Sequence, residues 1–463
     1  MSKPSFSAVA LVALLSGCAM GPDYVRPEAP VPVRWAESAP VVAALPSWRS
    51  FFPEPRLQAL IGLALENNRD LRIATARVAE ARAQYGIQSA DRLPNVDLAA
   101  GRSASRTPAD LSGIGRQLNV QRYDVSANLL SFELDFWGRV RSLNQAALAS
   151  YLASEEAQRA FRLSLIADVA NAYFSLLATE ERVSLARVTV KSRGETSELM
   201  EQRRRVGVAS DLDYLQAKGA FESARSDLAG LERSRAVAAN LLNLLVGNMP
   251  QNLAPGRALR EQGMAIDVAV GLSSEVLLRR PDVLSAEQRL IAANANIGAA
   301  RAAFLPRISL TGGFGTASSA LAGLFDAGSG AWNFQPMLRL PLFNAGRNEA
   351  NADLAEARKI IAVAEYEKII QQAFREVADL LSAREQLALQ LAAQEASERT
   401  QAARLSLTEA RYKGGVSSYL EVLDAQREFY SAQQGVVQTR GSLLATVAQL
   451  YKALGGGEYE EAR

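Results

Sequence analysis

One long segment without helix-breaking residues constrains the fold more than any other feature of the sequence. From Arg347 to Lys413 the chain has no proline and no glycine, and it is rich in Ala, Leu, Glu, Gln and Arg, which are strong helix formers. One helix of this length would reach roughly 100 Å, far more than a compact domain needs. A glycine-containing turn follows, and a second helical segment runs from Tyr419 to Leu454. The sequence therefore predicts a very long helical hairpin with its tip near 412–424.

The same hairpin is encoded twice. Residues 205–212 align with residues 413–420 at an offset of 208, and Gly138-Arg139 matches Gly346-Arg347 at that offset. An earlier block repeats at an offset of 212, where Leu93-Pro94 matches Leu305-Pro306. A period of ~210 residues is too long for a solenoid repeat. We expect two structurally equivalent halves of one molecule.

The N-terminus has the features of a bacterial lipoprotein precursor. An apolar run from Ala8 to Leu15 is too short to span a bilayer, and it ends in Leu15-Ser16-Gly17-Cys18. We predict a signal peptide over 1–17 and acyl chains on Cys18, which is the only cysteine in the chain. Several acyl chains anchor a protein firmly, whereas one chain is marginal. The alternative is a leftover cysteine in a cleaved leader.

Composition argues against several classes of function. The chain has no histidine, which removes Ser-His and Cys-His catalysis and the usual zinc chemistry. Its formal net charge is +2, so no nucleic-acid partner is suggested. We expect no enzyme activity, no catalytic residues, no metal and no cofactor beyond the acyl chains. Since no apolar run is long enough for a transmembrane helix, any further entry into a membrane must use β-strands.

The repeats divide the chain into successive segments. Residues 18–56 are rich in proline and predict a lipidated tether that runs along a surface. The first repeat covers 57–247 and comprises a helix, a β-hairpin at 94–136, and a long helical hairpin with its tip near 203–213. A linker or equatorial segment covers 248–281. The second repeat covers 282–456 and comprises a helix, a β-hairpin at 306–343, and the long hairpin with its tip near 412–424, and we expect 457–463 to form a flexible tail.

Within each half the hydrophobic period switches to two. Apolar residues alternate with polar ones in four runs, which are typical of membrane-spanning strands: Val96, Leu98 and Ala100; Tyr123, Val125, Ala127 and Leu129, with a slip of phase and possible bulge before Leu130, Phe132 and Leu134; Ile308, Leu310 and Phe314; and Trp332, Phe334, Leu338, Leu340 and Leu342. Trp332 and Phe334 are expected in an interfacial aromatic belt. Pro336 fits poorly, since proline forfeits a ladder hydrogen bond. The alternative is ordinary amphipathic strands of a soluble domain.

Four strands per chain set the oligomeric state. A sheet with open edges is not tolerated in lipid, so copies must combine. Eight strands enclose only side chains, whereas twelve leave an open interior. The predicted fold class is therefore mostly α with a transmembrane β part, namely a homotrimer with a twelve-stranded β-barrel continued by a twelve-helix α-barrel.

Several motifs together resemble one family. They are Cys18 with Gly21-Pro22-Asp23-Tyr24 after it, Arg279-Arg280-Pro281-Asp282, Leu340-Pro341-Leu342-Phe343-Asn344-Ala345-Gly346-Arg347, and residues 412–425. The chain resembles the TolC-like outer-membrane factors (outer membrane efflux proteins), within them the lipoprotein branch of the OprM and NodT type, over nearly the whole mature sequence.

The resemblance implies a function and partners. It implies a channel in the outer membrane of a Gram-negative bacterium, lipid-anchored and extending into the periplasm, that conducts small molecules and drugs passively. A periplasmic adaptor (membrane fusion) protein and an inner-membrane efflux transporter of the RND type would be its partners, beside outer-membrane lipid. Two alternatives stay open: the duct of a type I protein secretion system, and a non-conducting structural lipoprotein that spans the periplasm.

The hairpin tips are the candidate site. Glu421 and Asp424 are three residues apart, so they share a helix face. The resemblance implies a periplasmic gate at Tyr412, Asp213, Glu421 and Asp424, and adaptor contacts at Arg205, Gly207, Val208, Ser210, Gly415, Val416 and Ser418. An arginine often found in the family two residues after the second tip glycine is Ser417 here. For Asp211 we favour a simple helix-start role, where a carboxylate favours the helix dipole.

Overall fold

In the computed structural model of the chain, the long segment that precedes each hairpin tip, 139–205 and 347–413, forms a single helix. The structure describes residues 20–32, 35, 46–248, 254–264 and 274–457, so Cys18 and the predicted signal peptide lie outside the described residues. The elements are α2 (Trp48–Phe51), α3 (Pro55–Asn67), α4 (Arg69–Ala90), β1 (Val96–Thr107), β2 (Leu118–Leu134), α5 (Arg139–Arg205), α6 (Asp211–Val246), η1 (Leu259–Glu261), η2 (Ser274–Arg279), α7 (Pro281–Ala302), β3 (Arg307–Ser318), η3 (Leu321–Gly323), β4 (Gly330–Arg339), α8 (Arg347–Lys413) and α9 (Tyr419–Ala453).

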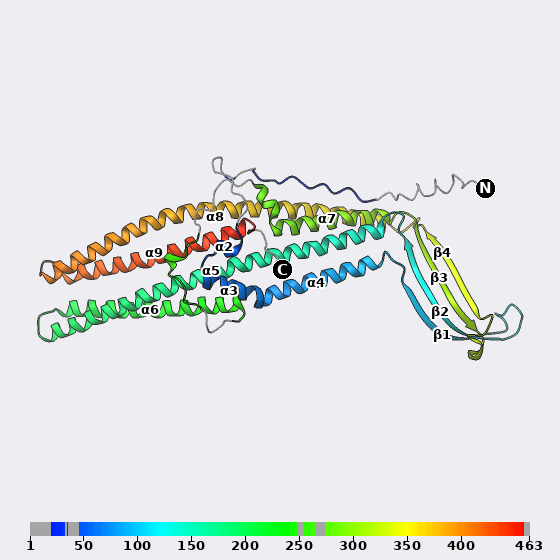
Figure 1. Cartoon of the computed structure of the whole chain (residues 1–463), viewed down its shortest axis with the longest axis horizontal. Helices are drawn as coiled ribbons and strands as arrows, with labels where there is room; N and C mark the ends of the chain where they lie inside the picture. Colours follow the sequence, from blue (N-terminus) through cyan, green and yellow to red (C-terminus); the bar gives the residue numbers. More distant parts are fainter. Residues whose placement is uncertain (1–19, 33–34, 36–45, 249–253, 265–273, 458–463) are drawn as a thin grey trace. The chain divides into compact units, whose positions relative to one another are not determined.

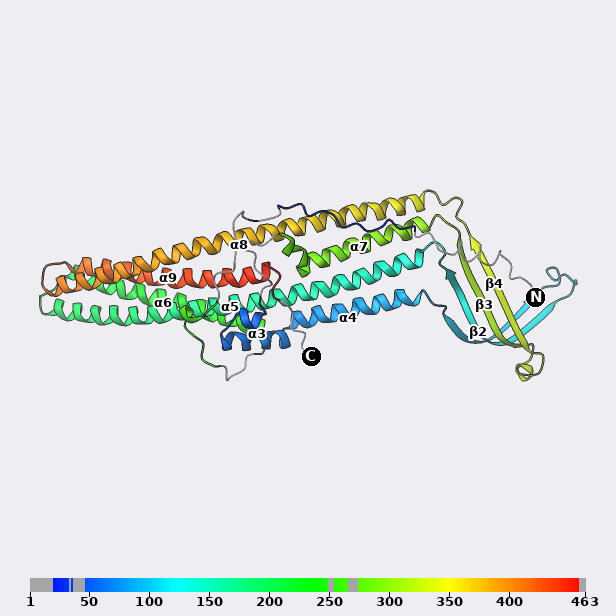
Figure 2. The same ribbon diagram turned by 45° about the horizontal axis from the view of Figure 1, so that its top comes forward.

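The chain divides into two compact units. The sheet unit comprises the described parts of 1–28, 77–155 and 285–367, and the hairpin unit comprises those of 29–76, 156–284 and 368–463. In the hairpin unit α6 runs back along α5 and α9 runs back along α8 (Figures 1 and 2). Both α5 and α8 have 67 residues, so the repeat seen in the sequence is a repeat of structure.

The four strands form one antiparallel sheet in the order β1-β2-β3-β4 (Figure 1). The pairing places the apolar members of the alternating runs on one face: Leu98 opposite Ala127, Ala127 opposite Phe314, and Phe314 opposite Trp332. On this face Leu98 is 80% exposed and Trp332 is 77% exposed within the chain. An apolar face of this kind, exposed on a single chain, fits contact with lipid.

Two irregular positions of the sheet have physical explanations. The register between β2 and β3 shifts between Leu129 and Phe132, and Ser131 has a positive φ of 51°, so the predicted slip of phase is a β-bulge. Pro336 lies on β4, which is an edge strand only within one chain. There a missing N–H is tolerated, and in an assembly that pairs β4 with another copy it removes at most one hydrogen bond from that contact. The strand ends at Arg339, earlier than the sequence pattern through Leu342 suggested, because Pro341 has no N–H to donate.

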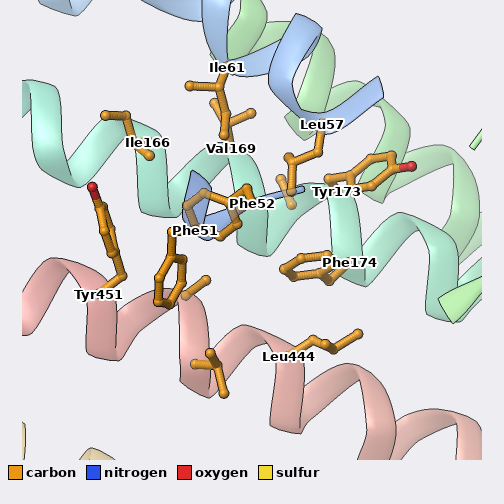
Figure 3. Packing of buried hydrophobic residues seen from close by; sticks show 14 of the residues in the cluster. Phe51, Phe52, Leu57, Ile61, Ile166, Val169, Tyr173, Phe174, Leu444 and Tyr451 are labelled. Carbon is orange, nitrogen blue, oxygen red and sulfur yellow. The ribbon is translucent and has the colours of Figure 1, made fainter. Parts of the chain in front are cut away.

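The core of the hairpin unit lies where α2, α3, α5 and α9 meet. Figure 3 shows Phe51 and Phe52 between Ile166, Val169 and Phe174 of α5 and Leu444 and Tyr451 of α9. The rings of Phe51 and Tyr451 have centroids 4.5 Å apart. The structure thus differs from the predicted tether over 18–56, since its last residues form a short helix whose aromatic side chains are buried in the core.

The buried guanidinium of Arg280 joins three segments of this unit near the end of α9. The Arg280 side chain is 6% exposed and donates to Glu376 at 2.9 Å, to Asp282 at 2.8 Å and to the Ala453 carbonyl at 2.6 Å. A buried guanidinium is tolerated only when its donors are satisfied. The Arg280-Pro281-Asp282 motif is therefore explained by the structure as a joint between the start of α7, the middle of α8 and the end of α9.

Two further differences concern the helices. The helix expected over 57–93 is two helices, α3 and α4, because the Asn68 side chain accepts from the Leu71 amide and donates to the Leu245 carbonyl, both at 2.9 Å. One 18-residue window of α5 is apolar enough by composition to cross a membrane, but 56% of that window is buried inside the structure. Core packing accounts for its apolar composition.

A close approach in the sheet gives a testable prediction. A Cβ on Gly315 would lie 2.0 Å from the Val125 carbonyl oxygen and 2.6 Å from the Ser126 Cα. Gly315→Ala should therefore force β2 and β3 apart, at a cost of about 1–3 kcal/mol or more, and reduce the amount of heat-modifiable protein in the outer membrane. Gly330→Ala is the matched control, because a Cβ there meets nothing within 4 Å. Equal yields of the two variants would contradict the observed pairing of β2 with β3.

Candidate functional site

The two hairpin tips have the same backbone geometry. Gly207 and Gly415, related by the repeat, have φ of 76° and 75°, a left-handed conformation that favours glycine. After each glycine a valine amide folds back: Val208 donates to the Arg203 carbonyl, and Val416 to the Arg411 carbonyl, both at 2.9 Å. The glycine-containing tip motif is therefore required to end one long helix and turn the chain toward the next.

Each returning helix begins with a capping box. The Ser210 hydroxyl accepts from the Asp213 amide while the Asp213 carboxylate accepts from Ser210, and Ser418 and Glu421 repeat this arrangement. The hydrogen bond from the Ser418 backbone amide, followed by serine side-chain bonds, lowers the pKa of Glu421. Two of the four predicted gate residues, Asp213 and Glu421, are thus engaged at the starts of their own helices.

Asp424 is held between two arginines. Its carboxylate accepts from Arg404 at 2.6 Å and from Arg427 at 2.7 Å. Arg404 and Asp424 are each ten residues from Gly414, on opposite sides of the turn, so the pair braces the second hairpin across its width. The sequence analysis did not include these arginines, although their equal distance from the tip glycine was a usable signal.

The two hairpins touch at their tips through an apolar cluster, which we call the tip cluster. It contains Met200 of α5, Ala217 of α6, and Tyr419 and Val422 of α9, with Ala209, Tyr214, Tyr412 and Leu423 packed around them. The Tyr412 and Tyr419 rings have centroids 5.8 Å apart. Burial, with Tyr412 next in effect, raises the pKa of Tyr419 to about 12.

One polar contact joins the hairpins beside this cluster. Arg203 of the first hairpin donates to the Tyr412 hydroxyl of the second at 3.1 Å. The predicted gate grouped Tyr412 with Asp213, but Asp213 is bonded within its own capping box, at 2.7 Å to the Ser210 hydroxyl. Arg203 lies far from Tyr412 in sequence, so local spacing gave no indication of it.

The predicted adaptor contacts lie at the surface of the tips. Arg205, Gly207, Val208, Ser210, Gly415, Val416 and Ser418 are all exposed. Four neighbouring apolar side chains that the sequence analysis did not include are exposed with them: Val206, Leu212, Leu215 and Leu420. Exposed apolar side chains gathered at one end of a protein indicate a binding surface.

Residues after the predicted lipidation site bind α7 within the sheet unit. Glu287 accepts two hydrogen bonds from Arg26, at 2.6 and 2.7 Å, and one from the Tyr24 hydroxyl at 3.0 Å. Asn294 donates to the Pro22 carbonyl at 2.8 Å. We call residues 20–26 the strap. Burial and the bond to Glu287 raise the pKa of Tyr24.

Comparison with known proteins identifies the family. Residues 60–248 and 272–456 match the family described as Outer membrane efflux protein. The chain belongs to the outer membrane efflux protein family. It is 45% identical over 475 residues to the Outer membrane protein OprJ of Pseudomonas aeruginosa, covering all of this chain and 98% of OprJ. It is 44% identical over 470 residues to the Toluene efflux pump outer membrane protein TtgC of Pseudomonas putida, covering all of this chain and 97% of TtgC.

Solved structures of bacterial membrane proteins have the same fold. A membrane protein from Pseudomonas aeruginosa has a TM-score of 0.88 at 44% identity, over 95% of this chain and all of the other. The open state of the Neisseria gonorrhoeae MtrE outer membrane channel has a TM-score of 0.86 at 40% identity, over 95% of this chain and 98% of MtrE. These likenesses confirm the predicted family, fold class, outer-membrane location and efflux-channel function.

The individual site residues stay predictions. This applies to acylation of Cys18, to the gate residues, to the adaptor contacts and to the aromatic belt at Trp332 and Phe334. The family is one of efflux channels, and the expectation that the chain has no enzyme activity also stays a prediction. Among the residues that the structure describes, no group of three or more His, Cys, Asp or Glu could hold a metal ion.

The capping boxes give a second prediction. Ser418→Ala removes the acceptor for the Glu421 amide, so amide hydrogens of the first turn of α9 should exchange about fivefold faster. Ser418→Thr keeps the hydroxyl and should exchange like the unsubstituted chain. Because the pKa of Glu421 is lowered, protection should be full above pH ~4.3 and fall as the pH drops through the lower pKa of the folded chain. Protection independent of both pH and Ser418 would contradict this role.

Proposed function

We propose that three copies of the chain close a twelve-stranded wall in the outer membrane and form the exit duct of a tripartite efflux pump. The observation that carries the proposal is a sheet with one apolar face and two outer strands, β1 and β4, that have no further partner strand in the described chain. Edges of this kind cannot face lipid unpaired. The sheet therefore supports an assembly in which each edge pairs with another copy.

The tips then act as the periplasmic gate. The tip cluster and the bond from Arg203 to Tyr412 hold the two hairpins of one chain together. A periplasmic adaptor that binds the exposed tip residues would compete with these contacts, and the hairpins would separate. The acids at Asp213, Glu421 and Asp424 lie beside the same contacts, which supports their predicted place at the entrance.

The names of relatives support a class of cargo. One relative is named for antibiotic efflux and another for toluene efflux. We propose that this duct carries small molecules of this kind and that an inner-membrane transporter selects them. The sheet argues against a purely structural periplasmic lipoprotein, because such a scaffold has no use for an apolar four-stranded face.

The gate can be tested in planar bilayers. The purified protein should insert and conduct poorly, and Arg203→Ala should raise its open probability about fivefold, because a hydrogen bond contributes about 1 kcal/mol. Tyr412→Phe should have the same effect, and the double variant should add nothing further. Arg205→Ala is the control, since Arg205 pairs with Glu201 of its own helix. A protein that never conducts would end the proposed function, while conducting variants identical to the parent would remove only the Arg203 contact.

The charge of the entrance gives a separate prediction. Asp424→Asn leaves Arg404 and Arg427 without their shared carboxylate. If Asp424 lines the entrance, the reversal potential under a salt gradient should move toward the value for anions. Combining it with Arg404→Gln restores the local charge balance and should reverse most of the change. An unchanged reversal potential in Asp424→Asn would place this carboxylate away from the path of ions.

A further inference from the structure

We call the contact between β4 of one copy and β1 of the next the seam. Given the assembly proposed above, its register can be derived from the pairing of β2 with β3 inside the chain. The sheet leaves the outer edges of β1 and β4 free, so β4 of one copy would pair with β1 of the next. The repeat relates β1 to β3 at an offset of 212 and β2 to β4 at an offset of 208. The pairing of β2 with β3 is therefore the internal counterpart of the pairing of β4 with β1 of the next copy.

This counterpart fixes a register. Within the chain Leu134 pairs with Ile308. The two offsets carry this pair to Leu342 and to Val96 of the next copy. β4 pairs with β3 without a bulge, so the register is constant along it. Three residues back from Leu342 and three residues on from Val96, Arg339 therefore lies opposite Ala99 of the next copy. Trp332, Phe334 and Leu338 of β4 then share a face with Val96, Leu98 and Ala100 of β1, as a lipid-facing surface requires.

Charges on the polar face fit this register. Arg307 and Arg339 pair directly across β3 and β4, and like charges in that position are destabilising. Glu133 of β2 compensates Arg307, at 2.6 Å between the carboxylate and Nε. In the described part of the chain, Arg339 has no acidic partner and Asp97 has no basic one. Both lie on the polar face near the same end of the two free edges.

We infer that Arg339 forms an ion pair with Asp97 of the next copy of this chain and so fixes the register of the seam. With Arg339 opposite Ala99, Asp97 is its diagonal neighbour, a position that long side chains reach. Glu133 and Arg307 form an ion pair across the corresponding contact inside the chain. The two offsets carry them to Pro341 and Asn95, so the inferred pair lies two residues farther along each strand, with the base on β4 and the acid on β1. A slip of one residue would turn Arg339 toward lipid.

Charge reversal tests the ion pair. Asp97→Arg and Arg339→Asp should each reduce the fraction of oligomer that resists SDS without heating by about fivefold, because each places like charges across every seam. The double variant reverses every pair and should recover most of the loss. Recovery of less than half of it, or single variants equal to the parent, would overturn the inference. A parent chain that forms no oligomer would instead remove the proposed assembly, and this seam with it.

Disulfide formation tests the register independently of charge. Cys18 is the only native cysteine, so introduced pairs report on the seam. Ala99→Cys with Arg339→Cys should give disulfide-linked dimers and trimers on non-reducing gels, since directly opposed residues have Cα atoms about 4.5–5.5 Å apart. Ala100→Cys with Arg339→Cys is the control, because those side chains point to opposite faces. Equal yields from the two pairs, or none from the first in assembled protein, would overturn the register.

Discussion

The backbone groups along the outer edges of β1 and β4 set the conditions for the rest of the structure. In hydrocarbon, unpaired N–H and C=O groups each cost several kcal/mol, so a lone four-stranded sheet cannot persist there. The sheet is stable only when other copies complete it. Its apolar face, which one chain leaves open to solvent, is useful only once that closure has occurred, which makes assembly a requirement of the fold.

The helices meet a comparable requirement inside one chain. Long hairpins leave unsatisfied groups at each end, and here the ends are satisfied locally by a left-handed glycine on one side and a capping box on the other. Both halves share these local devices because duplication preserved them. The contacts between the hairpins differ between the halves: Tyr412 accepts from Arg203, while its counterpart in the first half is Arg204, stacked on Tyr214. The tips are therefore similar in backbone but distinct in surface.

The sequence predicted what depends on local preference. Helix α8 has the predicted ends, Arg347 and Lys413, because propensity and the tip glycines point the same way throughout. The alternating runs placed the strands, and the slip after Leu129 indicated the bulge. Contacts between segments that are distant in the sequence could not be predicted from these local patterns. Phe51 and Phe52 lie in a proline-rich stretch that looks extended, and only packing against α5 and α9 shows that they belong to the core. Likewise Arg203 and Arg404 became visible as partners only in three dimensions.

The strap has a mechanical consequence. Glu287 holds Tyr24 and Arg26 against α7, and Tyr24 comes only six positions after Cys18 in the sequence. Fully extended, six residues reach about 20 Å. If Cys18 carries acyl chains, the membrane surface that holds them can lie no farther from Tyr24, and so from Glu287, than the length of this extended segment. An acylated Cys18 would therefore limit how far the start of α7 can lie from the bilayer surface.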